Sequence, residues 1–275
     1  MRMKLTPIIS ACLALVLAAC GLDADGSSSR GDSYATSVQQ ADQARKAGAV
    51  GESIPLYGRA LQVNPDGMEA KLGLGQSYLA LGASDEAAAQ FRDVLAKRSG
   101  DTVARRGLAS ALLSMGQPAL AVGQLAAALQ ADAGDYRAMN AMGVALDMQG
   151  QHEEAQVRYR EGIALAPDFL APRSNLGLSL AISGRGQEAV AQLVPLASGR
   201  GADARTRQNL AFAYAMSGDP TNALVVSRRD LTEASAQRQL SYYLMLKNLP
   251  ISARSAEIRR NPSFFPQASL RAAGG

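Results

Sequence analysis

A repeat period of about 34 residues is the feature that most constrains what this chain can fold into. Pairs made of a large apolar residue and a small one recur at that interval: Leu74-Gly75, Leu108-Ala109, Met142-Gly143, Leu176-Gly177 and Leu210-Ala211. A unit of this length is one supersecondary element that cannot bury its apolar face alone, so neighbouring units must stack. The period therefore predicts a solenoid of stacked units and not a single globular core.

Residues at fixed distances from each pair indicate that the unit is a helical hairpin. Small residues such as Gly75, Gly143 and Gly177 allow two helices to approach closely. Apolar residues four positions after the start of each pair fill the space between the helices: Tyr78, Leu112, Leu146, Leu180 and Tyr214. Glycines occupy the place where the first helix must stop: Gly116, Gly150, Gly184 and Gly218. We interpret these residues as core and helix caps.

The pattern resembles the tetratricopeptide repeat (TPR), which is about 34 residues long and carries a Leu-Gly pair, an aromatic, an alanine, a second aromatic and a proline. The segment that begins at Met68 matches it best, with Leu74-Gly75, Tyr78, Ala87, Phe91 and Val94. We therefore expect an all-α TPR solenoid over residues 34–247, with about six repeats.

Three further expectations concern where helices end or bend. Ala234 to Lys247 repeats the first-helix pattern without a partner helix, which predicts a closing helix that ends before Pro250. Pro55 and Pro195 lie inside predicted second helices, where each predicts a kink or a local break.

The first twenty residues have the order of an export signal. Arg2 and Lys4 precede an uncharged run of 15 residues, which is shorter than the roughly 20 that span a bilayer as a helix. Leu17 to Cys20 resembles the lipobox of bacterial lipoproteins. We therefore expect residues 1–19 to be cleaved and Cys20 to carry lipid. The alternative is an ordinary signal peptide that ends near a cysteine.

The residues after Cys20 predict a tether and a location. Residues 20–33 contain a single Leu and nothing that forms a core, so we expect a disordered tether behind the lipidated cysteine. Several acyl chains hold a lipoprotein stably on a membrane. Lipoproteins kept at the inner membrane often carry Asp after the cysteine, whereas this chain has Gly21. We expect the outer membrane, with the folded part facing the periplasm.

Residue types that carry catalysis are scarce. Cys12 and Cys20 are the only cysteines and His152 is the only histidine. His152 follows Gly150-Gln151 at the start of a predicted second helix, where we expect an exposed polar side chain and not a catalytic one. We predict that the protein is not an enzyme and holds neither a metal nor a cofactor.

The distribution of charge argues against nucleic acid as a partner. Two of the 28 basic residues leave with the signal, so 26 remain against 24 acidic residues, and they form no basic stripe. This is not the charge pattern of a nucleic-acid-binding protein, and the sequence gives no reason to expect a small-molecule substrate.

The face of each first helix that the hairpin does not use is the candidate binding surface. Residues at the fifth, ninth, twelfth and thirteenth places of the repeat share one side of a helix, and in TPR folds this side lines the concave groove. We call this set the groove stripe; it comprises Leu72, Gln76, Leu79, Arg106, Leu113, Asn140, Val144, Asp147, Met148, Leu178, Ile182, Gln208, Phe212 and Met216.

The groove stripe is largely apolar, and Arg106 is its one cation. A clamp for an acidic peptide terminus needs several cations, so the composition favours an amphipathic or hydrophobic partner helix instead. For each stripe residue, packing against the next repeat is the alternative.

Beyond the general repeat, residues from Tyr136 to Lys247 resemble the TadD family, the TPR lipoproteins of tight-adherence (Flp) pilus assembly. The likeness rests on Asn140 to Asp147, Ala155-Gln156 with Tyr159-Arg160, Asn175 to Leu180 with Gly184-Arg185, Arg207 to Leu210, Gly218-Asp219, Asp230-Leu231 and Tyr242-Tyr243. The resemblance implies an outer-membrane lipoprotein that helps to assemble or place the pilus machinery, including its secretin channel. A lipoprotein adaptor that docks cell-wall hydrolases is the rival; an enzyme is a second rival, which the scarcity of catalytic residues disfavours.

The C-terminal tail, residues 248–275, carries four arginines against one glutamate, with Phe264-Phe265-Pro266 among them. Three alternatives stay open for it: folding back into the groove, contacting a partner, or staying loose. A loose end is the usual state of a terminus, so we expect a partly disordered tail.

Overall fold

The computed structural model describes residues 28–199 and 202–260, and all regular structure in those ranges is α-helical. Six hairpins follow one another, and two more helices close the array. The first helices of the hairpins are α1 (Ser28–Lys46), α3 (Met68–Leu81), α5 (Thr102–Ser114), α7 (Tyr136–Gln149), α9 (Leu170–Ile182) and α11 (Ala204–Ser217). The second helices are α2 (Val50–Val63), α4 (Ser84–Lys97), α6 (Pro118–Ala131), α8 (His152–Leu165), α10 (Gly186–Ser198) and α12 (Pro220–Ser227). The closing helices are α13 (Glu233–Lys247) and α14 (Ile251–Arg260).

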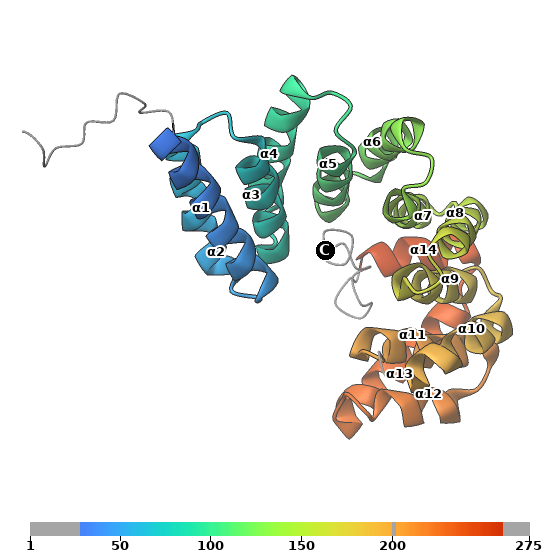
Figure 1. Ribbon diagram of the computed structural model, residues 1–275. Coiled ribbons are helices and arrows are strands. Elements are labelled where there is room, and N and C mark those ends of the chain that lie inside the picture. The colour runs from blue at the N-terminus through green and yellow to red at the C-terminus, as the bar shows by residue number, and fades with distance from the viewer. Residues whose placement is uncertain (1–27, 200–201, 261–275) are drawn as a thin grey trace, which may run out of the picture.

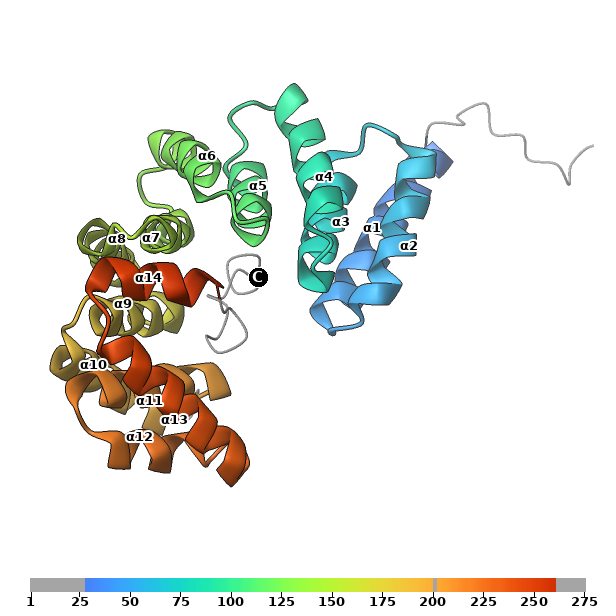
Figure 2. The same cartoon turned by 180° about the vertical axis from the view of Figure 1, so that it is seen from behind.

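The hairpins stack into an open arc (Figure 1). Each second helix packs against the first helix of the next hairpin, and each first helix also contacts the next first helix. Because the first helices lie next to one another along the array, they form its shorter, inner row. The second helices form the outer row, as the view from behind also shows (Figure 2). The predicted all-α solenoid of six repeats is confirmed.

Glycines in the left-handed conformation end the first helices. Gly150 has φ 84°, its N–H bonds to the carbonyl of Asp147, and the next N–H bonds to that of Leu146. Such a conformation is strained for any residue with a Cβ, which explains why glycine recurs here. Gly48 and Gly82 have the same conformation, so all six hairpins use this turn.

Aspartates begin several of the first helices. The side chain of Asp101 accepts a bond from the N–H of Ala104 at 2.8 Å, and Asp135 and Asp203 cap α7 and α11 in the same way. Each cap satisfies one of the free N–H groups at a helix start. Fixed starts and fixed ends give hairpins of nearly constant length.

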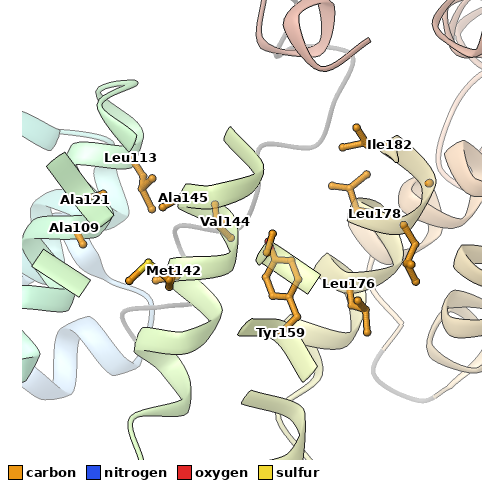
Figure 3. Close-up of a cluster of buried hydrophobic side chains, with 14 of the residues drawn as sticks. Ala109, Leu113, Ala121, Met142, Val144, Ala145, Tyr159, Leu176, Leu178 and Ile182 are labelled. Carbon is orange, nitrogen blue, oxygen red and sulfur yellow. The ribbon is translucent and has the colours of Figure 1, made fainter. Parts of the chain in front are cut away.

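The core of hairpins one to five is a large side chain of the second helix, in most cases set against a glycine of a first helix. Tyr57, Phe91, Leu125, Tyr159 and Leu193 occupy the same place in successive repeats and are fully buried. An added Cβ at Gly143 would lie 2.4 Å from Tyr159, and one at Gly177 would lie 2.5 Å from Leu193. The predicted close approach is therefore confirmed; Figure 3 shows Tyr159 between α7 and α9.

Both interior prolines lie in unbroken helices, contrary to the local breaks that we considered. Pro55 is inside α2 and Pro195 is inside α10. Both rings are exposed, so water can hydrate the carbonyl that each proline leaves without a donor. Buried Tyr57 and Leu193 hold the two helices in place by packing.

The two ends of the solenoid differ from the expected boundaries. The predicted closing helix is α13, but α14 follows it, so part of the tail is ordered. Helix α1 begins at Ser28, within the stretch expected to be a tether, because extending a formed helix by a few residues costs little. The predicted signal, residues 1–19, Cys20 and residues 21–27 lie outside the described residues. Within residues 28–199 and 202–260, no helix has the length and apolarity needed to cross a membrane.

Candidate protein-binding surface

The groove stripe divides into half-buried and buried residues. On the inner row of repeats two and three, Leu72, Gln76, Leu79 and Arg106 keep part of their surface, as do Asp147, Met148 and Gln208 further along. Leu113, Asn140, Val144, Leu178, Ile182, Phe212 and Met216 are each less than 9% exposed. A partner on the inner face therefore reaches mainly the first group, and its binding there stays a prediction.

Two of the buried stripe residues join elements of the fold. Asn140 accepts a bond from the amide of Asn175 at 2.9 Å, which links α7 to α9. Phe212 packs edge to face against Tyr243 of α13, with ring centroids 5.0 Å apart. Both residues belong to contacts between helices, which is the alternative that the sequence left open for every stripe residue.

Arg106, the one cation of the stripe, is paired within the fold. Its Nε lies 2.8 Å from Oδ2 of Asp135, and both side chains are mostly buried. Asp135 also caps α7 through its other oxygen. An acidic peptide would have to compete with this pair, which agrees with the prediction that the groove does not clamp acidic termini.

His152 is buried, so the expectation of an exposed side chain was wrong. It is 5% exposed, because α14 packs over the turn between α7 and α8. Its Nδ1–H donates to Asp147 Oδ1 at 2.7 Å, and its Nε2 lies 2.7 Å from Ser255 Oγ of α14. Hairpin four is thus bonded to a residue 103 positions later in the chain.

Asp147 is the centre of this polar cluster. It also accepts bonds from Ser179 Oγ at 2.8 Å and from the hydroxyl of Tyr159 at 2.9 Å. Burial raises the pKa of the Asp147 carboxyl, whereas the bonds from His152, Ser179 and Tyr159 act to lower it. Burial, reinforced by the charge of Asp147, raises the pKa of Tyr159 well above its ordinary value. The Asp147 side chain is 16% exposed, and a carboxylate that is mostly buried needs several donors, which this one has.

The order Asp147, His152, Ser255 is that of a hydrolase triad, but the serine does not face a substrate site. Ser255 is 6% exposed, and its hydroxyl also bonds to the carbonyl of Ile251, one turn earlier in α14. A nucleophile has to reach a substrate atom, whereas Ser255 lies inside the contact between α14 and α8. The cluster joins four helices: α7, α8, α9 and α14. No group of three or more potential metal ligands occurs within the described residues.

Helix α14 is fixed by arginines that cap the ends of other helices. Arg254 is 6% exposed and donates to the carbonyl of Ile182, at the end of α9, at 2.6 Å. It also donates to the carbonyl of Leu246, in the last turn of α13, at 3.1 Å. Arg259 donates to the carbonyl of Met148, in the last turn of α7, at 3.3 Å. Such carbonyls lack helical partners, and the helix dipole favours a cation beside them.

Sequence comparison agrees with the fold. A family described as "Tetratricopeptide repeat" matches residues 38–102 and 106–157. The matched segments carry tetratricopeptide repeats, and the fold of the array is a TPR solenoid. These segments run from within α1 to within α8, and the structure extends the same hairpin geometry through α12. No curated protein matches the chain.

Solved structures share the fold at low sequence identity. A TPR protein from Parabacteroides merdae has a TM-score of 0.64 and 14% identity, over 77% of this chain and 84% of that one. PilW, described as a widely conserved type IV pilus biogenesis factor, has a TM-score of 0.63 and 19% identity, over 71% and 91%. A thermophilic TPR protein of Thermus thermophilus has a TM-score of 0.59 and 21% identity, over 66% and 98%. At these identities the likeness is one of fold.

Proposed function

We propose that this protein is a binding scaffold of the bacterial envelope, anchored by lipid at Cys20 to the outer membrane and facing the periplasm. It assists the assembly or placement of the tight-adherence pilus machinery, and the secretin channel is the partner to test first. The TadD resemblance over Tyr136 to Lys247 supports the pilus assignment. The lipobox-like sequence supports the anchor.

The observation that carries a binding role is the half-exposed apolar surface on the inner row of hairpin two. Leu72 and Leu79 lie on one side of α3 with Gln76 between them, and the concave side of an arc offers a partner a long contact. TPR folds bind other proteins, and an apolar groove of this kind suits the apolar face of an amphipathic helix. PilW, which shares this fold, is described as a type IV pilus biogenesis factor, and this supports the pilus assignment.

The test is capture of partners from cells that carry the pilus genes. The tagged full chain is cross-linked in intact cells and purified, and its partners are identified by mass spectrometry. We expect the wild-type chain to recover the secretin and the double variant Gln76→Arg/Leu79→Gln to recover little of it. The matched control is Leu120→Gln, on the outer helix α6, where the side chain is 60% exposed; it should capture as the wild type does.

Other outcomes decide against parts of the proposal. Recovery of cell-wall hydrolases in place of the secretin would favour the adaptor role. Equal capture by the groove variant and the outer-face control would place the contact elsewhere. Cys20→Ala tests the anchor separately: we expect loss of labelled lipid and release from the membrane fraction, and a Cys20→Ala chain that stays membrane-bound would refute lipid anchoring.

A further inference from the structure

Helix α14 lies across hairpins four and five and contacts both of them. The carbonyls that Arg254 and Arg259 contact belong to Ile182 and Met148, which occupy the same place in hairpins five and four. The two arginines thus bind the same backbone carbonyl of two successive repeats, near the end of the first helix. The Ser255–His152 bond adds a side-chain contact between these two anchors. Figure 2 shows α14 crossing the region of α7 and α9.

The docked helix covers the end of the groove stripe. At the thirteenth place of the repeat, Ser114 of hairpin three is exposed and Ala80 of hairpin two is half-buried. At the same place in hairpin five, Ile182 is only 6% exposed, and α14 packs against α9. Removal of α14 would therefore uncover His152 in hairpin four and the end of α9 in hairpin five, both of which α14 contacts.

We propose that the ends of α7 and α9, together with His152, form a helix-docking site that α14 occupies at rest and that a partner helix takes over in function. This inference rests on the proposed protein-binding role and names the regulation of the same groove. The partner segment has the chemistry of α14: a short helix with two arginines spaced as Arg254 and Arg259 are, and a small hydroxyl residue next to the first. Partner binding then requires that α14 leave.

The construction of α14 fits reversible docking. It has 10 residues, whereas isolated helices shorter than about 12–15 residues are marginal in water, so it is helical because it is docked. Its hydrogen bonds to the hairpins include those of Arg254, Ser255 and Arg259. Its apolar contribution is small: Ile258 packs partly buried against the core, while Ile251 at its start stays 46% exposed. Polar anchors can be exchanged for equivalent anchors from a partner without leaving a large apolar surface in water. The chain between α13 and α14, residues 248–250, is short and tethers the displaced helix nearby.

The experiment asks whether the site accepts α14 supplied as a separate molecule. The probe is a fluorescent peptide of residues 249–260, and binding to the full chain is followed by anisotropy. In the wild-type chain the tethered copy competes at an effective concentration on the order of millimolar. Ser255→Trp removes that competitor, because a large ring cannot enter the buried contact with His152. We expect the peptide to bind Ser255→Trp at least tenfold more tightly than the wild type.

Matched controls separate docking from general effects. Ser252→Trp makes the same change on the exposed side of α14 and should behave as the wild type. A peptide with Arg254→Gln/Arg259→Gln should bind the Ser255→Trp chain at least tenfold more weakly than the native peptide. Arg254→Gln/Arg259→Gln in the full chain is a second way to release α14, and it should expose the site as Ser255→Trp does.

Two results would overturn the inference. Equal affinity of the peptide for the wild-type chain and for the two variants that release α14 would mean that α14 does not occupy the site in competition with the peptide. Absence of binding to both released chains, with their circular dichroism showing folded hairpins, would mean that α14 is a permanent part of the fold. No pilus component enters this assay, so failure to capture a secretin and failure of peptide docking are distinguishable.

Discussion

Gly143→Ala tests whether the close approach of two helices, and not helix propensity, decides the residue at this place in the repeat. The added Cβ would lie 2.4 Å from Cε1 of Tyr159. Tyr159 is 1% exposed, and its hydroxyl donates to Asp147 Oδ2. The methyl group must therefore move the ring, or separate α7 from α8, and either movement disturbs the bond to Asp147.

The expected loss follows from three effects. Overpacking of a dense core costs about 1–3 kcal/mol. Loss of a hydrogen bond to a buried charged group costs about 1.5–3 kcal/mol. Alanine is a better helix former than glycine by about 1 kcal/mol, which acts in the opposite direction. The net destabilisation is about 1.5–5 kcal/mol, so the two unfavourable effects exceed the propensity gain.

The assay is urea unfolding followed by circular dichroism, with midpoints compared between variants, because long repeat arrays need not unfold in one step. Gly123→Ala is the matched control: this glycine lies within α6, and an added Cβ there meets nothing within 4 Å. We expect Gly123→Ala to raise the midpoint and Gly143→Ala to lower it. A rise in both variants would refute the steric reasoning.

Three further predictions concern local features of the hairpins. Asp101→Ala removes the cap bond to Ala104 and should lower the free energy of unfolding by about 1 kcal/mol, whereas Asp101→Asn should nearly restore it in the same urea assay. Gly116→Ala places a Cβ at φ 71° and should cost about 1–2 kcal/mol; an unchanged midpoint would show that the turn can readjust. Arg207 donates to both carboxylate oxygens of Asp230 and lowers the pKa of that carboxyl. The ion pair therefore stabilises the folded state above the unfolded pKa of about 3.9. This contribution is lost as the pH falls through the folded pKa of Asp230. Arg207→Gln should therefore raise the pKa of Asp230 in an NMR titration and destabilise the protein at neutral pH but not in strong acid, and an unmoved pKa would contradict the assignment.

Most of the fold could be predicted because local rules decide it. The left-handed turns need glycine, the hairpin core needs a small residue opposite a large one, and both requirements return at each repeat. The closing helix could be predicted for the same reason, within one residue of its observed start at Glu233. The local break considered at Pro55 does not occur, because the rule for interior proline omits packing, which here holds α2 together.

The groove stripe could be predicted only in part, because spacing along one helix identifies a side but not what covers it. Phe212 has the spacing of a groove residue, yet Tyr243 of α13 packs on it. Asn140 has the same spacing, yet its oxygen accepts a bond from Asn175 of the next first helix. Each covering contact joins residues that lie on different helices and far apart in the sequence, and no local pattern encodes it.

The sequence does contain a signal for α14. Pro250 is followed by ten residues without Gly or Pro, and Ile251 and Ile258 lie two helical turns apart, which is typical of a short helix with one apolar side. The docking of this helix is not encoded locally, because Ser255 and His152 lie 103 positions apart. For this reason His152 looked like an ordinary surface residue at a helix start.

Asp147 connects these observations. At the twelfth place of the repeat, the neighbouring hairpins have Leu113 and Ala181, and both are buried. Hairpin four instead has a carboxylate whose pKa burial raises, a substitution that lowers stability unless donors surround it. His152 supplies one donor and also contacts Ser255 of α14. Departures from a local rule tend to mark functional sites, and the hairpin that departs from the apolar pattern at this place is one of the two on which α14 docks.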